Sequence, residues 1–192
     1  MEANILWTGR EYYSLENCLV IEGKDRCTID SSIVGLYNGT LYRVHYMIHT
    51  NTLWETTSIR LSTQLNNKRE VHTYQSNEPG YWLHLGEACP KFDGCIDPDI
   101  PLTPFTNTLP IRRLKMKIGE SREIKVMYLD VLANRFTPVR QKYIRLSEFE
   151  YKYENIPNDF EAVITVDNEG LVVNYPELFT RTARQDTRYS FK

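Results

Sequence analysis

The feature that most constrains the fold of this chain is a proline-dense stretch, residues 94–114, with the sequence GCIDPDIPLTPFTNTLPIRRL. It holds four of the nine prolines: Pro98, Pro101, Pro104 and Pro110. Proline fixes its own φ, lacks a backbone N–H and pushes the preceding residue toward extended conformations, which disfavours a helix or a central strand. The apolar side chains between the prolines favour burial over disorder. We therefore predict a long, stiff, ordered loop, and such loops are commonly functional.

On both sides of this stretch the hydrophobic pattern has a period of two. In 42–48 every second residue is apolar, which predicts a half-buried strand. A turn at Asn38-Gly39 joins it to a strand over 28–34 as a hairpin. Further strands are predicted over 56–63, 71–74, 81–85, 114–118, 124–128, 151–153, 160–166 and 171–175. No window shows sustained helical periodicity, and only short helices are predicted, over 146–149 and 176–179.

These patterns predict one all-β domain. The 192 residues suffice for a single hydrophobic core, and no Gly/Ser-rich or charged linker divides them. We assign the domain to residues 1–180. Residues 181–192 are polar with four basic side chains, and we predict a frayed or loosely docked C-terminal tail.

Composition and charge exclude several classes of function. The formal net charge is −2 and the pI about 6.1, which gives no electrostatic drive toward nucleic acid or an anionic membrane surface. The N-terminal residues do not read as a signal peptide, and no stretch approaches 18 apolar residues, so we expect a cytoplasmic protein with no membrane-spanning segment. The four cysteines lack C-x-x-C spacing, so we expect buried thiols and neither a metal site nor a cofactor.

Polar residues of the proline-rich stretch are the candidate site. Asp97, Asp99 and Asn107 offer acceptors, and Arg112–Arg113 offers guanidinium donors. The two aspartates either pair with the arginines to hold the loop or contact a ligand. The arginines follow the loop into a predicted strand, where successive residues point to opposite faces, so only one can face a cavity.

Aromatic residues are the second candidate group. The chain has 13 tyrosines but only 7 phenylalanines, together with Trp54 and Trp82 among its tryptophans. Aromatic residues favour strands, and they also stack on sugars and pack against alkyl chains. We therefore keep both readings for Trp54 and Trp82, as sheet formers and as ligand-contacting residues.

The order G-C-I-D-P-D-I followed by T-P-F-T-N-T-L-P-I-R-R-L resembles the signature of a bacterial family named "Putative glycolipid-binding". Weaker matches flank it from Trp7 to Phe179, including Ser32–Gly35 and Gly170–Leu171. The resemblance implies mainly antiparallel strands in a curved, spirally rolled sheet, a β-roll or half-barrel with few short helices. It also implies an amphiphilic ligand.

The function we predict is non-catalytic binding of an amphiphile, a glycolipid by the resemblance, in a β-sheet cleft. Its alkyl chains would lie against the concave face of the sheet, and Asp97, Asn107, Arg112 and Arg113 would hold its head group. One alternative is a hydrolase or transferase acting on a sugar or lipid conjugate, with Asp97 or Asp99 as acid or base. Another is a protein-interaction scaffold, which predicts a solid core with no lipid-sized cavity.

Overall fold

The computed structural model describes residues 1–186. The first half of the chain forms strands β1 (Glu2–Gly9), β2 (Ser14–Glu22), β3 (Cys27–Tyr37), β4 (Thr40–Thr50), β5 (Thr56–Leu65), β6 (Lys68–Glu78), β7 (Tyr81–His84) and β8 (Glu87–Ala88). A 3-10 turn, η1 (Pro90–Phe92), strand β9 (Asp97–Asp99) and helix α1 (Phe105–Leu114) follow. The second half forms β10 (Ser121–Asp130), β11 (Arg135–Arg145), β12 (Glu150–Ile156), β13 (Glu161–Val166), β14 (Val172–Tyr175) and β15 (Phe179–Asp186).

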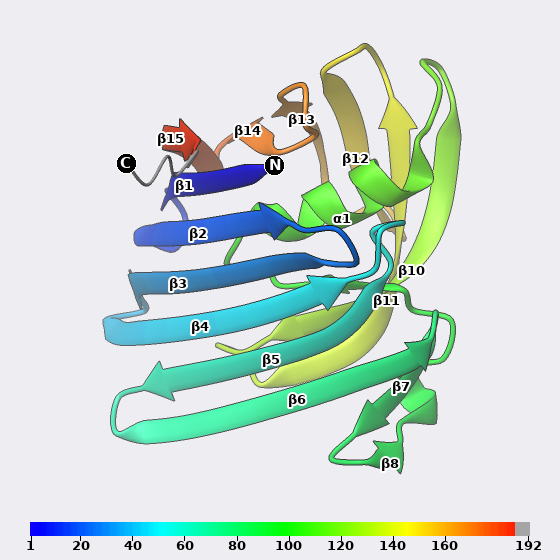
Figure 1. The fold of residues 1–192 in the computed structure, drawn as a ribbon. Helices are drawn as coiled ribbons and strands as arrows, with labels where there is room; N and C mark the ends of the chain where they lie inside the picture. The colour runs from blue at the N-terminus through cyan, green and yellow to red at the C-terminus, as the bar shows by residue number, and fades with distance from the viewer. Residues whose placement is uncertain (187–192) are drawn as a thin grey trace, which may run out of the picture.

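All the described strands belong to one open sheet, in the order β8-β7-β6-β5-β4-β3-β2-β1-β15-β14-β13-β12-β11-β10-β9. Each half is a meander of neighbouring antiparallel strands, and the pairing of β1 with β15 joins the halves. Only β9 pairs in parallel, with β10 at one edge of the sheet. The sheet curls so that β10 and β11 pass behind β5 and β6, with α1 inside the curve (Figure 1). The predicted fold class, an all-β rolled sheet, is confirmed.

The β3–β4 hairpin shows how local sequence sets this geometry. Asn38 and Gly39 both have positive φ, 48° and 74°, as a two-residue type I′ turn requires. The turn sets the register that places Val34 opposite Arg43 and Gly35 opposite Tyr42. Alternation then sends Ile33 and Val44 inward and Val34 and Arg43 outward.

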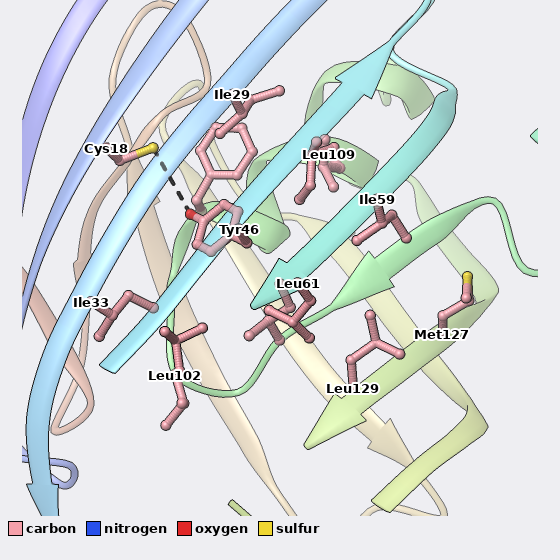
Figure 2. Close-up of a cluster of buried hydrophobic side chains, with 14 of the residues drawn as sticks. Cys18, Ile29, Ile33, Tyr46, Ile59, Leu61, Leu102, Leu109, Met127 and Leu129 are labelled. Atoms are coloured by element: carbon pink, nitrogen blue, oxygen red, sulfur yellow. Dashed lines mark hydrogen bonds between the residues drawn. The ribbon is translucent and has the colours of Figure 1, made fainter. Parts of the chain in front are cut away.

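The core fills the inside of the curve. Figure 2 shows Leu102 and Leu109 among side chains of β3, β5 and β10, including Ile33, Leu61 and Leu129. All five are at most 1% exposed. Rings of β6 and β11 also meet across the curve, with 4.5 Å between the centroids of His72 and Phe136. The two halves therefore pack on each other through the proline-rich stretch.

The prediction of a continuous loop over 94–114 is wrong in part, because Phe105–Leu114 forms helix α1 with Pro110 inside it. Pro104 lies at the N-cap, where no intrahelical N–H bond is needed. Pro110 removes one backbone hydrogen bond from a ten-residue helix. Every residue from Phe105 to Ile111 is buried, so tertiary packing outweighs the local cost.

Other local predictions are also corrected. Residues 115–120 form no strand, and neither 146–149 nor 176–179 is helical. Residues 181–186 are not a frayed tail, because β15 pairs with β1 as far as Ala3 opposite Asp186. Pairing between the chain ends leaves no signal in a short sequence window, so the β1–β15 pair was not predicted. The remainder of the predicted tail, 187–192, lies outside the described residues.

Candidate functional site

Asp97 and Arg113 form a buried ion pair with each other. Arg113 donates from Nε to Oδ1 of Asp97 at 3.1 Å and from Nη2 to Oδ2 at 2.5 Å. Asp97 is fully buried, and its pKa is raised by burial, while the guanidinium opposes that shift. The bidentate contact ties edge strand β9 to the last turn of α1.

Asp99 and Asn107 bond to protein groups of the interior. Asp99 accepts a 2.6 Å hydrogen bond from the Gln141 amide of β11, and burial raises its pKa to about 6. Asn107 accepts a 2.8 Å hydrogen bond from the Tyr143 hydroxyl and donates to the Pro104 carbonyl at 3.3 Å. The Asn107–Tyr143 bond docks α1 against β11, and the Asp99–Gln141 bond docks β9 against the same strand.

Arg112 leaves the helix in another direction and meets Trp54. Its guanidinium carbon lies 4.5 Å from the ring centroid, while its nitrogens donate to Glu22 at 2.7 Å and to the Glu169 carbonyl at 2.8 Å. The prediction that the two arginines enter a strand is wrong, because both belong to α1. The two arginines do point in different directions, because residues adjacent in a helix are turned about 100° apart.

Trp54 and Arg112 line a polar cleft of about 540 Å³ at the C-terminal end of α1. Half of its other lining residues are charged: Glu22, Lys115, Arg145, Glu148, Asp167 and Glu169. Asp167 and Glu169 are already bonded to Arg184, at 2.7 and 2.9 Å. Trp82 lies apart from this cleft and donates from its indole to the Cys95 carbonyl at 2.7 Å. The seven predicted site residues are thus not one constellation.

The predicted place for alkyl chains, the concave face, is corrected by the core. That face is covered by α1 and by Ile100, Leu102 and Phe105, all at most 1% exposed. Apolar residues of the proline-rich stretch occupy the volume that a ligand chain would need. The physical reason is that the apolar inner face of a sheet must be buried, and these residues fill the space between its two halves.

A large cleft lies instead on the outer face of the sheet, where the β1–β2, β3–β4 and β5–β6 turns meet. This groove has a volume of about 1450 Å³, above the usual range for small-molecule sites. We name it the outer groove. Its lining residues are Thr8, Gly9, Arg10, Tyr13, Ser14, Leu15, Val34, Gly35, Leu36, Leu41, Tyr42, Arg43, Gln64, Asn66, Asn67 and Arg69.

Cross-strand register orders the groove. One row runs from Thr8 to Leu15, Val34 and Arg43, each directly opposite the next on neighbouring strands. The row continues through Gln64 to Arg69. Beyond Val34, the pair Leu36–Leu41 extends the apolar part, and the Leu41 side chain is 74% exposed. An apolar strip therefore adjoins a cationic and amide-bearing strip.

A buried carboxyl lies on the inner face beneath this groove. Oε1 of Glu16, the residue after Leu15, accepts hydrogen bonds from Tyr46 at 2.6 Å, Ser31 at 2.7 Å and Thr103 at 2.8 Å. Oε2 of Glu16 is buried and has no partner in the described part of the chain. Burial raises the pKa of Glu16 to about 7. The carboxyl links three strands to the proline-rich stretch.

Sequence reasoning missed the outer groove. Its signal was present in the alternation, since Leu15, Val34, Leu36 and Leu41 occupy positions where a half-buried strand normally places polar side chains. Reading that signal requires knowing which face is outward and which strands are neighbours. The candidate site was predicted in the proline-rich stretch because prolines, aspartates and arginines are concentrated there.

The family model "Putative glycolipid-binding" matches residues 4–181. This chain belongs to that family. The chain is also similar to a solved structure, the crystal structure of a DUF1089 family protein from Pseudomonas aeruginosa. The two share 34% identity with a TM-score of 0.80, over 88% of this chain and 91% of the other. No curated protein matches the chain.

Two further findings concern membrane-spanning helices and metal-ligating side chains. None of its helices within residues 1–186 has the length and apolarity to cross a bilayer. The same residues hold no group of three or more His, Cys, Asp or Glu side chains placed to ligate a metal.

Proposed function

We propose that the protein binds an amphiphile of the glycolipid class, without catalysis, in the outer groove. The observation that carries the proposal is the groove itself: an apolar strip, exposed on an outer sheet face, next to arginine and amide side chains. A ligand's alkyl chain would cover Leu15, Val34, Leu36 and Leu41, and its head group would meet the polar strip. The family's name supports the ligand class.

The energetics of this arrangement are adequate. Burial of apolar surface contributes about 0.8 kcal/mol per methylene. Ten methylenes would supply roughly 8 kcal/mol before the cost of immobilising the ligand. That figure is the value for full burial, and a chain lying in an open groove gains only the share of its surface that the groove covers.

The test is isothermal titration calorimetry with n-dodecyl β-maltoside, a sugar-headed amphiphile, below its critical micelle concentration. We expect saturable binding to the unaltered protein. The double variant Leu15→Thr/Val34→Thr places β-branched residues, which favour strands, at both positions and shortens the apolar strip, and we expect binding at least about tenfold weaker. Val163→Thr is the matched control, because Val163 is an exposed strand residue outside the groove.

Failure of the unaltered protein to bind the maltoside or any other dodecyl amphiphile would overturn the proposal. The filled interior would then favour the interaction-scaffold reading, which requires a solid core. Equal binding by the unaltered protein and the Leu15/Val34 variant would place the ligand elsewhere. The polar cleft beside Trp54 and Arg112 would be the next candidate.

A further inference from the structure

The lining of the outer groove is strongly biased in charge. It contains three arginines, Arg10, Arg43 and Arg69, and no aspartate or glutamate. The chain as a whole carries a net charge of −2, so the bias is local. The alternation of β6 places Glu70, next to Arg69, on the opposite face of the strand, where Glu70 pairs with Lys68 at 2.5 Å.

The three guanidinium groups are also without counter-ions. Within residues 1–186, none of the three forms an ion pair, and Arg10 makes only a 3.2 Å side-chain hydrogen bond to Thr180. Arg112, Arg113 and Arg184, by contrast, are each paired with a carboxylate. Like charges gathered on one face of the sheet repel, and a bound anion would relieve that repulsion.

Register brings two of these arginines close enough to share a ligand. Arg43 of β4 lies opposite Gln64 of β5, which lies opposite Arg69 of β6. The two arginines are thus two strands apart on one face, roughly 10 Å between their backbones. Both long side chains can converge over Gln64, and Leu15 and Val34 continue the same row.

From these observations we propose that the head group recognised in the groove is anionic, carrying a phosphate or a carboxylate. This inference rests on the proposed function and adds the charge of the ligand to it. Guanidinium groups donate planar pairs of hydrogen bonds that match phosphate and carboxylate oxygens. A neutral sugar head group would call for acceptors as well as donors, and the lining offers only the amide oxygens of Gln64, Asn66 and Asn67 as side-chain acceptors beside its hydroxyls.

The experiment compares two ligands with the same twelve-carbon chain, dodecyl phosphate and n-dodecyl β-maltoside, by calorimetry below their critical micelle concentrations. We expect dodecyl phosphate to bind at least about tenfold more tightly, with an affinity that falls as salt rises. Arg43→Gln and Arg69→Gln should each weaken dodecyl phosphate binding about tenfold, and should weaken maltoside binding by a clearly smaller factor, because a neutral head group does not pair with the guanidinium charge. Arg60→Gln is the control, because Arg60 is exposed on the outer face of β5 but does not line the groove.

The outcomes of this experiment distinguish the charge of the head group from amphiphile binding itself. Equal affinities for the two ligands, or equal losses in the Arg43 and Arg60 variants, would overturn the anionic head group and leave amphiphile binding standing. Binding of neither ligand would overturn the proposed function itself. Inorganic phosphate alone is the third ligand: binding as tight as that of dodecyl phosphate would show a site for a free anion and overturn the lipid head group.

Discussion

At the residue scale, ionisable side chains in this protein are mostly structural. Asp97 with Arg113 and Asp99 with Gln141 hold the proline-rich stretch, and Glu16 gathers three hydroxyl groups under the outer groove. Their unusual pKa values come from burial. A buried carboxyl with a raised pKa indicates catalysis only when a substrate can reach it, and none of these three carboxyls lines the outer groove or the polar cleft.

Glu16 gives a pH dependence of stability with a definite sign. Its folded-state pKa of about 7 lies above its ordinary 4.5, so the folded protein binds the proton more tightly than the unfolded chain. Stability should therefore be greatest below pH 4.5 with respect to this group, fall as pH rises toward 7, and then level off, by about 3 kcal/mol in all. Glu16→Gln, which resembles the protonated acid, should lack this fall and be the more stable protein at pH 8. Urea denaturation from pH 4.5 to 8 measures it, and parallel curves would contradict the assignment.

The ion pair of α1 allows a comparison of adjacent arginines. Arg113→Met leaves the carboxylate of Asp97 buried without its partner, and we expect a loss of about 3–5 kcal/mol in the free energy of unfolding. Arg112→Met is the matched control. The side chain of its partner Glu22 is 33% exposed, against 0% for Asp97, so water can solvate Glu22 and the loss should be smaller. Similar losses in both variants would contradict the distinction.

At the element scale, α1 shows how a helix survives an internal proline. Seven consecutive residues are buried between the two halves of the sheet, and side chains tie the helix to β9 and β11. The helix would be marginal in isolation. Its stability comes from where it lies, so it should respond to the loss of single docking contacts.

Tyr143→Phe tests the docking of α1. The change removes the 2.8 Å hydrogen bond to Asn107 and leaves a buried amide oxygen unpaired, which should cost about 1–3 kcal/mol. Tyr151→Phe is the control, since in residues 1–186 no hydrogen bond to the Tyr151 hydroxyl is present. Thermal unfolding followed by circular dichroism measures both, and an unchanged midpoint for Tyr143→Phe would show that the helix does not depend on this contact.

At the scale of the whole molecule, the curled sheet separates the core from the proposed binding surface. Its inner face is covered by residues of the proline-rich stretch (Figure 2), and the outer groove lies on the other face. Stability and ligand binding should therefore respond to different substitutions. If the lipid were bound inside the curve, the same substitutions would change both stability and ligand affinity.

Leu102→Ala distinguishes these two architectures. Leu102 is 1% exposed and fills the concave face, so truncation should lower the free energy of unfolding by about 2–5 kcal/mol and leave dodecyl maltoside affinity unchanged. The Leu15→Thr/Val34→Thr variant should behave oppositely, with stability within about 0.5 kcal/mol of the unaltered protein. A gain in maltoside affinity in Leu102→Ala would instead locate alkyl chains inside the curve.

The sequence by itself determined much of this protein. Period-two alternation predicted the β3–β4 hairpin and strands such as β5 and β13, Asn38-Gly39 predicted its turn, and one long motif identified the family and thus the rolled sheet. These features depend on neighbours in the chain or on a contiguous signature. Only the tertiary structure decided that β15 pairs with β1, that Phe105–Leu114 is a helix, and that Arg113 rather than Arg112 meets Asp97.

The outer groove belongs to the second group for the same reason. It combines Leu15, Val34, Arg43 and Arg69 from four strands, and no window of sequence contains that row. Whether an apolar strand residue faces the core or solvent depends on which side the rest of the chain covers. In this protein the apolar side chains of the proline-rich stretch cover the inner face of the sheet, and the outer face stays exposed.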